Sequence, residues 1–375
     1  MLYYLHTAFC LRSLLFVLVV AVLGGCATWQ PPAVPGPLPA LAQADIAALL
    51  PPHVSDTAGW ARDIQVAFTT QRLVPSTTNV CAALAVIGQE SSFAASPVVP
   101  GLPRIARVEI ERRAAAAHVP GFALNAALGL KSSNGQTYDR RLDRVRTEQQ
   151  LSDLFEDFLA RVPLGRSMFG RFNPVHTGGP MQVDIDFAQA HAQDYPYDDG
   201  VDVRSEVFSR RGGVYFGVLH LLAYDTNYPS PLYRFADYNA GWYASRNAAF
   251  QQAVSQLTGI KLALDGDLVT YGSTAQSHTE RATKTLSSRI DLSEGTIRAD
   301  LTESETADFA TTELYKRVFA LADATLASPG QAVPRQILPG ITLESPKITR
   351  TLTTAWFAKR VESRWQACMT RAGKS

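Results

Sequence analysis

Residues 79–93 (NVCAALAVIGQESSF) place the strongest local constraint on what this chain can fold into. At helical spacing their apolar side chains fall on one stripe, formed by Val80, Ala83, Leu84 and Ile87. The stripe continues onto Glu90, so a carboxyl group closes an apolar helix face. Thr77 and Thr78 are candidate N-caps, and the run that ends at Pro97 marks the exit from the helix. The pattern predicts a helix that packs on one face and ends at an acid.

The position of Glu90 favours a proton donor. Negative charge is disfavoured near a helix C-terminus, and partial desolvation also disfavours the ionised carboxylate. Both effects favour the protonated form, which a general acid requires. The alternative is a solvated residue in a fraying last turn.

Two later segments also lie at predicted helix boundaries. Residues 178–183 (GGPMQV) are predicted as a tight turn that runs into a helix, and residues 237–241 (DYNAG) as a helix end that runs into a turn. A Gly-rich helix is predicted between them, at residues 212–222. Together with residues 89–93 (QESSF), these segments resemble the lysozyme-like lytic transglycosylases. The signature of that family is E-S-x-F, then G-L-M-Q-V, then A-Y-N-A-G.

The resemblance implies a mainly α fold with a lysozyme-like, goose-lysozyme-type catalytic domain over residues 52–259. A large helical insertion would occupy about residues 94–172, and residues 260–375 would form a C-terminal α-rich extension that packs on the body. The insertion would be part of the groove wall or a separate interaction surface. From the residues alone, the chain is long enough for two domains or for one elaborated domain.

The resemblance also implies a reaction without a cofactor. Glu90 would protonate the bond between N-acetylmuramic acid and N-acetylglucosamine in peptidoglycan glycan strands, and would then act as base on the muramoyl C6 hydroxyl. The product is a 1,6-anhydromuramoyl end. Ser91 would help to orient Glu90, and the substrate would be bound by Met181, Gln182, Tyr238 and Asn239.

The chain departs from the family pattern at three points. Gln182 follows Glu90 after 92 positions, where typical members have a short connection. Pro180 stands where the family usually has Leu, and Asp237 where it usually has Ala. Asp237 is expected to be a helix-end surface residue; if it pointed into the cleft, it would activate water, and the protein would be a hydrolase. A scaffold lipoprotein that binds peptidoglycan without cleaving it is the third alternative.

The N-terminus resembles a lipoprotein signal. Arg12 supplies positive charge, residues 13–23 are an apolar core too short to span a bilayer, and residues 23–26 (LGGC) resemble a lipoprotein cleavage box. Residues 1–25 would be the signal peptide, and Cys26 would carry lipid and hold the protein on a membrane. Ala27 after the Cys implies the inner leaflet of the outer membrane, facing the periplasm. An ordinary secretory signal or a short anchor is the alternative.

Residues 26–51 are predicted as a Pro-rich tether from the membrane to the folded body. The net charge of +1 gives no electrostatic footprint for nucleic acid. The sequence has neither C-x-x-C nor H-E-x-x-H, so no metal site is expected. Beyond the signal and the lipid site, Cys81 and Cys368 remain, as one disulfide or as two separately buried thiols. Partner proteins are not indicated.

Periodicity and breaker residues also predict helices elsewhere, at residues 56–73, 103–118, 140–162, 183–192, 213–224, 303–327 and 349–369. Residues 261–271 are predicted to be partly strand, and residues 273–289 a polar segment with few core residues. The last helix has an aromatic stripe that is expected to pack back on the body.

Overall fold

The computed structural model describes residues 40–161, 173–197, 200, 202–328, 330–343 and 351–373. The predicted signal peptide, the lipid site at Cys26, the tether up to Pro39 and residues 162–172 of the predicted insertion lie outside this part of the chain. A compact unit begins at Ala40. Its described residues are mainly α-helical, as the sequence predicts. None of the described helices is both long and apolar enough to cross a membrane.

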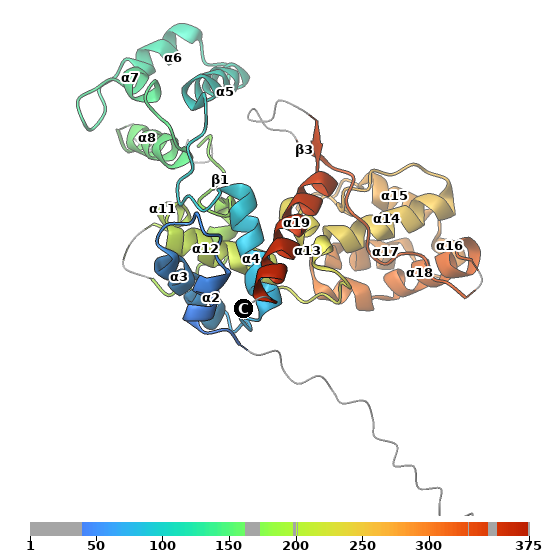
Figure 1. Ribbon diagram of the computed structural model, residues 1–375. Helices are drawn as coiled ribbons and strands as arrows, with labels where there is room; N and C mark the ends of the chain where they lie inside the picture. The colour runs from blue at the N-terminus through green and yellow to red at the C-terminus, as the bar shows by residue number, and fades with distance from the viewer. Residues whose placement is uncertain are drawn as a thin grey trace, which may run out of the picture. The chain divides into compact units, whose positions relative to one another are not determined.

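Helices from the beginning, the middle and the end of the described chain build the first hydrophobic core (Figure 1). They are α2 (Gln43–Leu49), α3 (Thr57–Thr70), α4 (Thr77–Glu90), α12 (Arg210–Leu222), α13 (Pro231–Ala240) and α19 (Thr354–Ala372). Helix α3 packs along α12, and α19 packs along both α4 and α13. Helix α2 packs on α3 and buries Ile46 and Leu49. Assigning residues 40–51 to the tether was therefore wrong, because these apolar side chains belong to the core.

Local sequence explains where the helix before the site begins. The Ser76 side chain accepts a hydrogen bond from the Asn79 backbone N–H and caps α4, so the cap lies one residue before the predicted Thr77. The predicted apolar stripe of α4 is fully buried. The preceding helix, α3, is capped by Asp56, which accepts from the Gly59 N–H.

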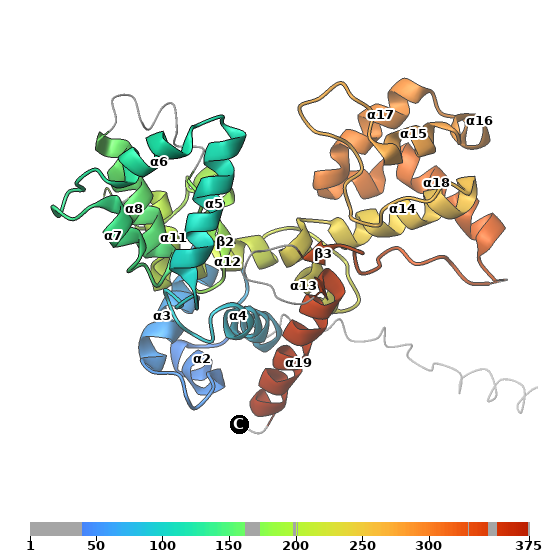
Figure 2. The same ribbon diagram turned by 90° about the horizontal axis from the view of Figure 1, so that it is seen from above.

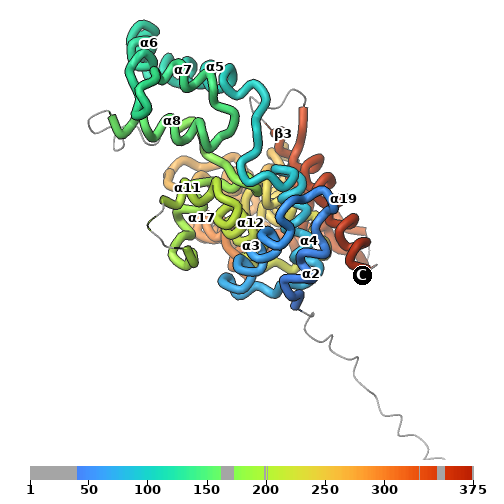
Figure 3. The backbone as a smooth tube through the Cα atoms, turned by 60° about the vertical axis from the view of Figure 1, so that its left-hand side comes forward, coloured from blue at the N-terminus to red at the C-terminus, as the bar shows by residue number. Residues whose placement is uncertain are grey.

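Residues 94–161 hold the predicted helical insertion, and its helices lie next to one another in Figure 3. They are α5 (Leu102–Ala116), α6 (Gly121–Leu128), α7 (Tyr138–Leu142) and α8 (Glu148–Arg161). The single helix predicted for residues 140–162 is two helices. The chain between α7 and α8 is extended because Thr147 forms a β-bridge with Val98, and the Val99 N–H donates to the Arg146 carbonyl. The start of the insertion is thus tied to the start of α8.

Buried side chains of the insertion, such as Leu142 and Leu154, belong to the first core, and a small hairpin follows the insertion in sequence. Strands β1 (Thr177–Gly178) and β2 (Val183–Asp184) pair antiparallel, and α10 (Ile185–Ala190) and α11 (Val203–Val207) follow. The sequence predicts a turn that runs directly into a helix, whereas the structure inserts a strand between them. Asp184 then caps α10 by accepting from the Phe187 N–H.

A second hydrophobic core is built by α14, which lies before the predicted boundary at residue 260, together with the C-terminal extension (Figure 2). Its elements are α14 (Ala244–Thr258), α15 (His278–Lys284), α16 (Ser287–Ile290), α17 (Glu294–Thr302), the 3-10 helices η2 (Glu303–Glu305) and η3 (Ala307–Thr311), and α18 (Glu313–Leu326). Residues 261–271 form no strand, and residues 303–327 are not one helix. Residues 273–289 contribute the buried side chains of Ala282 and Leu286, so this segment is more than a polar connection.

The chain returns to the first core through β3 (Thr342–Leu343), β4 (Leu352–Thr353) and α19. Phe357 and Val361 of α19 are buried, in agreement with the predicted core role of its apolar stripe. Cys368 of α19 forms a disulfide with Cys81 of α4, with 5.5 Å between the two Cα atoms. Of the two alternatives for these thiols, the structure has the disulfide.

Candidate functional site

Glu90 is the last residue of α4 and is half-buried. The next residue, Ser91, ends the helix and is buried. The Ile87 carbonyl accepts both the Ser91 backbone N–H and the Ser91 hydroxyl, each at 3.0 Å. Ser91 thus fixes the last turn that presents Glu90.

The hairpin turn lies directly on the Gly-rich helix α12. A Cβ atom on Gly213 would overlap the ring of Pro180, and one on Gly217 would overlap the Met181 side chain. Both glycines are therefore required by close packing. The Met181 side chain is fully buried in this contact, so it belongs to the core and does not line a cleft.

Tyr238 of α13 is the side chain that connects the three sequence segments. Its hydroxyl donates to the Met181 carbonyl at 2.7 Å, and its ring packs beside His220, with 4.9 Å between the ring centroids. Burial, and then the nearby Glu90 carboxylate, raise the pKa of Tyr238 well above its ordinary value. One buried tyrosine therefore joins α13 to the hairpin turn, and it is near enough to Glu90 for that carboxylate to affect its pKa.

Gln182 occupies a special position in the hairpin. Its φ of 52° is in the left-handed region, which is costly for a residue other than glycine and is frequent at functional sites. Its side-chain Nε2 donates to Glu148 Oε2 at 3.1 Å and to the Gly179 carbonyl at 3.3 Å. Both amide hydrogens are thus used within the protein, and Oε1 accepts from the Thr177 hydroxyl at 3.5 Å. An amide oxygen has two lone pairs, so Oε1 can accept one further hydrogen bond, from a ligand N–H.

Glu148 is a site residue that the sequence analysis missed. It is in the first turn of α8, within the insertion, and only 9% of it is exposed. In sequence it is one of several polar residues in a predicted helix, so no local signal distinguishes it. The contact with Gln182 places a second carboxylate beside the candidate site.

Asn239 is exposed, and its Oδ1 accepts a hydrogen bond from the Thr354 hydroxyl at 2.9 Å. This contact ties the end of α13 to the start of α19. The side-chain oxygen of Asn239 is thus hydrogen-bonded to α19.

Asp237 is not the surface residue that the sequence analysis expects. It is fully buried and accepts hydrogen bonds from the hydroxyls of Tyr224 (3.1 Å) and Tyr228 (2.8 Å) and from the Ser245 N–H (2.7 Å). Burial raises its pKa, while these donors act in the opposite direction. Its two carboxylate oxygens are occupied by the protein, so the hydrolytic role considered for Asp237 has no structural basis.

Comparisons with known proteins define the class of this chain. Residues 53–371 match the family described as "Protein of unknown function (DUF1615)", and the chain belongs to that family. Over 358 residues it is 51% identical to the "Uncharacterized protein YaiW" of Escherichia coli (strain K12), covering 95% of this chain and 98% of that relative. No solved structure matches the chain. The resemblance to lytic transglycosylases therefore depends on its three motifs and on where the fold brings them.

Proposed function

We propose that the protein is a peptidoglycan lytic transglycosylase in which Glu90 serves as acid and then as base. The observation that supports this most directly is the position of Tyr238. Its hydroxyl binds the hairpin carbonyl of Met181, and the Glu90 carboxylate perturbs its ionisation. Glu90 and Tyr238, which are 148 positions apart in sequence (238 − 90), are thus near one another and near the hairpin.

The chemistry follows from the environment of Glu90. Cleavage of a glycosidic bond requires a proton for the leaving oxygen and an acceptor for the attacking hydroxyl. A half-buried carboxyl group at a helix end can perform both steps in turn, because after it gives its proton to the leaving oxygen it is a carboxylate that can accept the proton of the attacking hydroxyl. Gln182 Oε1 would accept from the N-acetyl N–H of a sugar, in an orientation fixed by Glu148.

The test is digestion of purified peptidoglycan sacculi, followed by mass analysis of the products. Wild type should release 1,6-anhydro ends, which are lighter than reducing ends by one water. Glu90→Gln should reduce the rate by roughly 10²- to 10⁴-fold while leaving thermal unfolding unchanged. Glu111→Gln, the same substitution at an exposed position of α5, is the matched control and should be fully active. Equal sacculus binding by wild type and Glu90→Gln without any cleavage would replace this proposal with a scaffold role.

A hydrolase is the second candidate, and Glu148 is the observation that favours it. Many glycosidases use two carboxylates, of which one activates water. If wild type releases only reducing ends, and Glu148→Gln abolishes that release, the protein is a muramidase of goose-lysozyme type. Anhydro ends from both wild type and Glu148→Gln would exclude it.

The location of the enzyme is a separate part of the proposal. We propose that lipid on Cys26 holds the protein on the periplasmic face of the outer membrane, within reach of peptidoglycan. The Cys81–Cys368 disulfide supports an oxidising compartment outside the cytoplasm. Metabolic labelling with a fatty acid should mark the wild type and not Cys26→Ser; label retained by the variant would contradict the anchor.

A further inference from the structure

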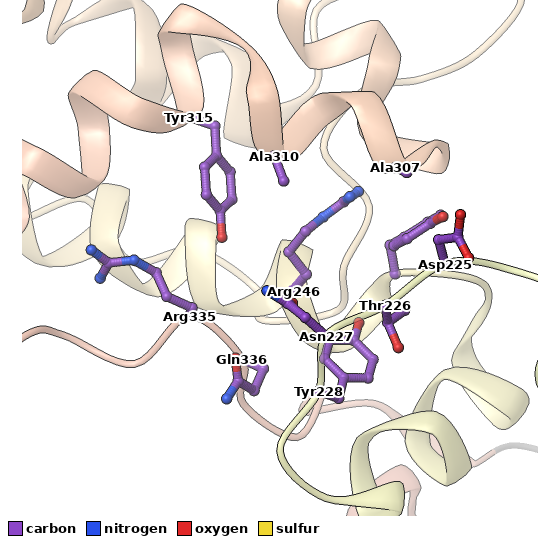
Figure 4. Close-up of a pocket in the computed structure, with 11 residues that line it drawn as sticks. Asp225, Thr226, Asn227, Tyr228, Arg246, Ala307, Ala310, Tyr315, Arg335 and Gln336 are labelled. Carbon is purple, nitrogen blue, oxygen red and sulfur yellow. The ribbon is translucent and has the colours of Figure 1, made fainter. Parts of the chain in front are cut away.

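A cavity of about 670 Å³ lies where the first core meets the C-terminal extension (Figure 4). It is lined by the segment between α12 and α13, the start of α14, η3, α18 and the chain that follows α18. Glu90, Gln182 and Tyr238 do not line it, so it is distinct from the candidate site. Its volume is within the range of small-ligand pockets.

Arg246 is the most unusual group in this cavity. Only 6% of it is exposed, and its hydrogen-bond partners are neutral oxygens: Asn247 Oδ1, the Ser304 carbonyl at 2.6 Å and the Thr306 carbonyl at 2.8 Å. Its guanidinium also lies 4.2 Å from the centre of the Tyr243 ring. No Asp or Glu among the described residues lies within ion-pair distance of it. A buried positive charge of this kind favours an anionic ligand group.

The other charged groups narrow the choice of anion. Arg335 is already paired with Asp323 at 2.5 Å, so its charge is balanced within the protein. Asp225 is exposed and adds a negative charge to the lining. Arg246 and Asp225 are therefore the two charged groups of the lining whose charges are not balanced by an ion pair with a described residue. One positive and one negative group suit a zwitterion better than a phosphate dianion, which Asp225 would repel.

The uncharged lining matches a peptide. Figure 4 shows the Tyr315 ring extending into the cavity with its hydroxyl foremost, and Gln336 and Asn227 on the opposite side. Within the described part of the chain, none of these three side chains has a hydrogen-bond partner. Their amide and hydroxyl groups can therefore bind peptide N–H and C=O groups, and the tyrosine faces can cover apolar side chains.

We propose that this cavity binds a short zwitterionic peptide, with a carboxylate of the peptide at Arg246 and its ammonium group beside Asp225. The inference rests on the proposed function in naming the source, which is the peptide stem that peptidoglycan strands carry. The N-terminus of a stem is amide-bonded to the glycan, so the ammonium group is that of the diamino acid in the stem. The cavity and the candidate site share α13, since Tyr228 of the cavity lining donates to Asp237 and the next residue, Tyr238, donates to Met181. A glycan strand that is cleaved near Glu90 would then also be bound through its peptide, in the cavity.

Calorimetric titration of the purified protein with a synthetic stem tetrapeptide tests the inference without any glycosidic bond. The free peptide should bind, and amidation of its carboxylates should weaken binding at least tenfold. Tyr315→Phe and Gln336→Ala should each weaken binding several-fold, whereas Gln331→Ala, at an exposed glutamine outside the cavity, should not. In a tetrapeptide with an acetylated N-terminus, Asp225→Asn should weaken binding when the diamino-acid side chain has a free amine, and should have no effect when that amine is also acetylated. Arg246 is left intact, because its contacts also hold η2 and η3 in place.

The outcomes separate this inference from the proposed function. Three results would overturn the cavity assignment even if sacculi are cleaved. They are equal affinity for the free and amidated peptides, unchanged affinity in Tyr315→Phe and Gln336→Ala, and no binding at millimolar peptide. Binding that meets all of these expectations without sacculus cleavage would support the cavity and reject the transglycosylase. An unrelated zwitterionic tetrapeptide that binds as tightly as the stem would overturn the choice of peptidoglycan as source.

Discussion

Reduction of the Cys81–Cys368 disulfide should lower the stability of this protein by several kcal/mol. The bond closes a loop between residues 287 positions apart. In the chain-entropy description, a loop of that length removes about 5 to 6 kcal/mol of conformational freedom from the unfolded chain at 25 °C. Cys81 and Cys368 are 0% and 1% exposed, and Phe357 and Val361 also hold α19 against the core. We therefore expect the reduced protein to remain folded, and the loss to arise mainly from a freer unfolded state.

Guanidinium unfolding followed by circular dichroism measures this effect. A chain that starts at Ala27 leaves Cys81 and Cys368 as its only thiols. On reduction, the free energy of unfolding should fall by about 3 to 6 kcal/mol, and the denaturant slope should rise because the unfolded state becomes more open. A double variant with Ala at both positions should be indifferent to reductant. If two free thiols are titrated in the reduced protein and its stability has fallen by less than about 1 kcal/mol, the loop-closure argument is refuted.

Three further predictions concern the buried polar groups. Asp237→Ala should lower the free energy of unfolding by about 3 to 5 kcal/mol, because three donors lose their acceptor. Tyr228→Phe removes one of these donors and should lower the free energy of unfolding by about 1 kcal/mol. Equal losses for the two variants in urea unfolding would contradict this. Tyr238→Phe should cost about 1 to 2 kcal/mol in the same assay, because the Met181 carbonyl loses its donor, and an unchanged midpoint would count against the hydrogen bond. Burial, and then His191, lower the pKa of His220 from 6.5 to about 4, so its stabilising effect is complete above about pH 6.5 and is lost as the pH falls towards 4. Wild type should lose up to about 3 kcal/mol more than His220→Phe between pH 7 and pH 4, and identical acid sensitivity of the two proteins would disprove the assignment.

Much of the first core could be predicted from local sequence. The apolar stripe of α4 and its end at Glu90 follow from helical periodicity, and the starts of α3 and α4 follow from side chains that cap backbone N–H groups. The Gly-rich segment was correctly predicted as a helix. The reason for its glycines could not be predicted, because Gly213 and Gly217 are required only when the hairpin turn packs on α12.

The errors have a common cause. Strands β1 and β2 are two residues each, too short for an alternating pattern, and the break between α7 and α8 depends on a bridge to Val98 far back in the chain. The local sequence around Asp237 is typical of a polar helix end. Its carboxylate can be buried because the hydroxyls of Tyr224 and Tyr228 donate hydrogen bonds to it.

The sequence by itself therefore determined a mainly α chain, helices such as α3, α4, α5, α12 and α19, and three motifs that resemble those of lytic transglycosylases, because periodicity and capping act over a few residues. The tertiary structure alone decided that Cys81 reaches Cys368, that Glu148 contacts Gln182, and that Tyr238 connects Glu90 with the hairpin. These contacts join residues tens to hundreds of positions apart, and only the packing of α4, α12, α13 and α19 into one core brings them together.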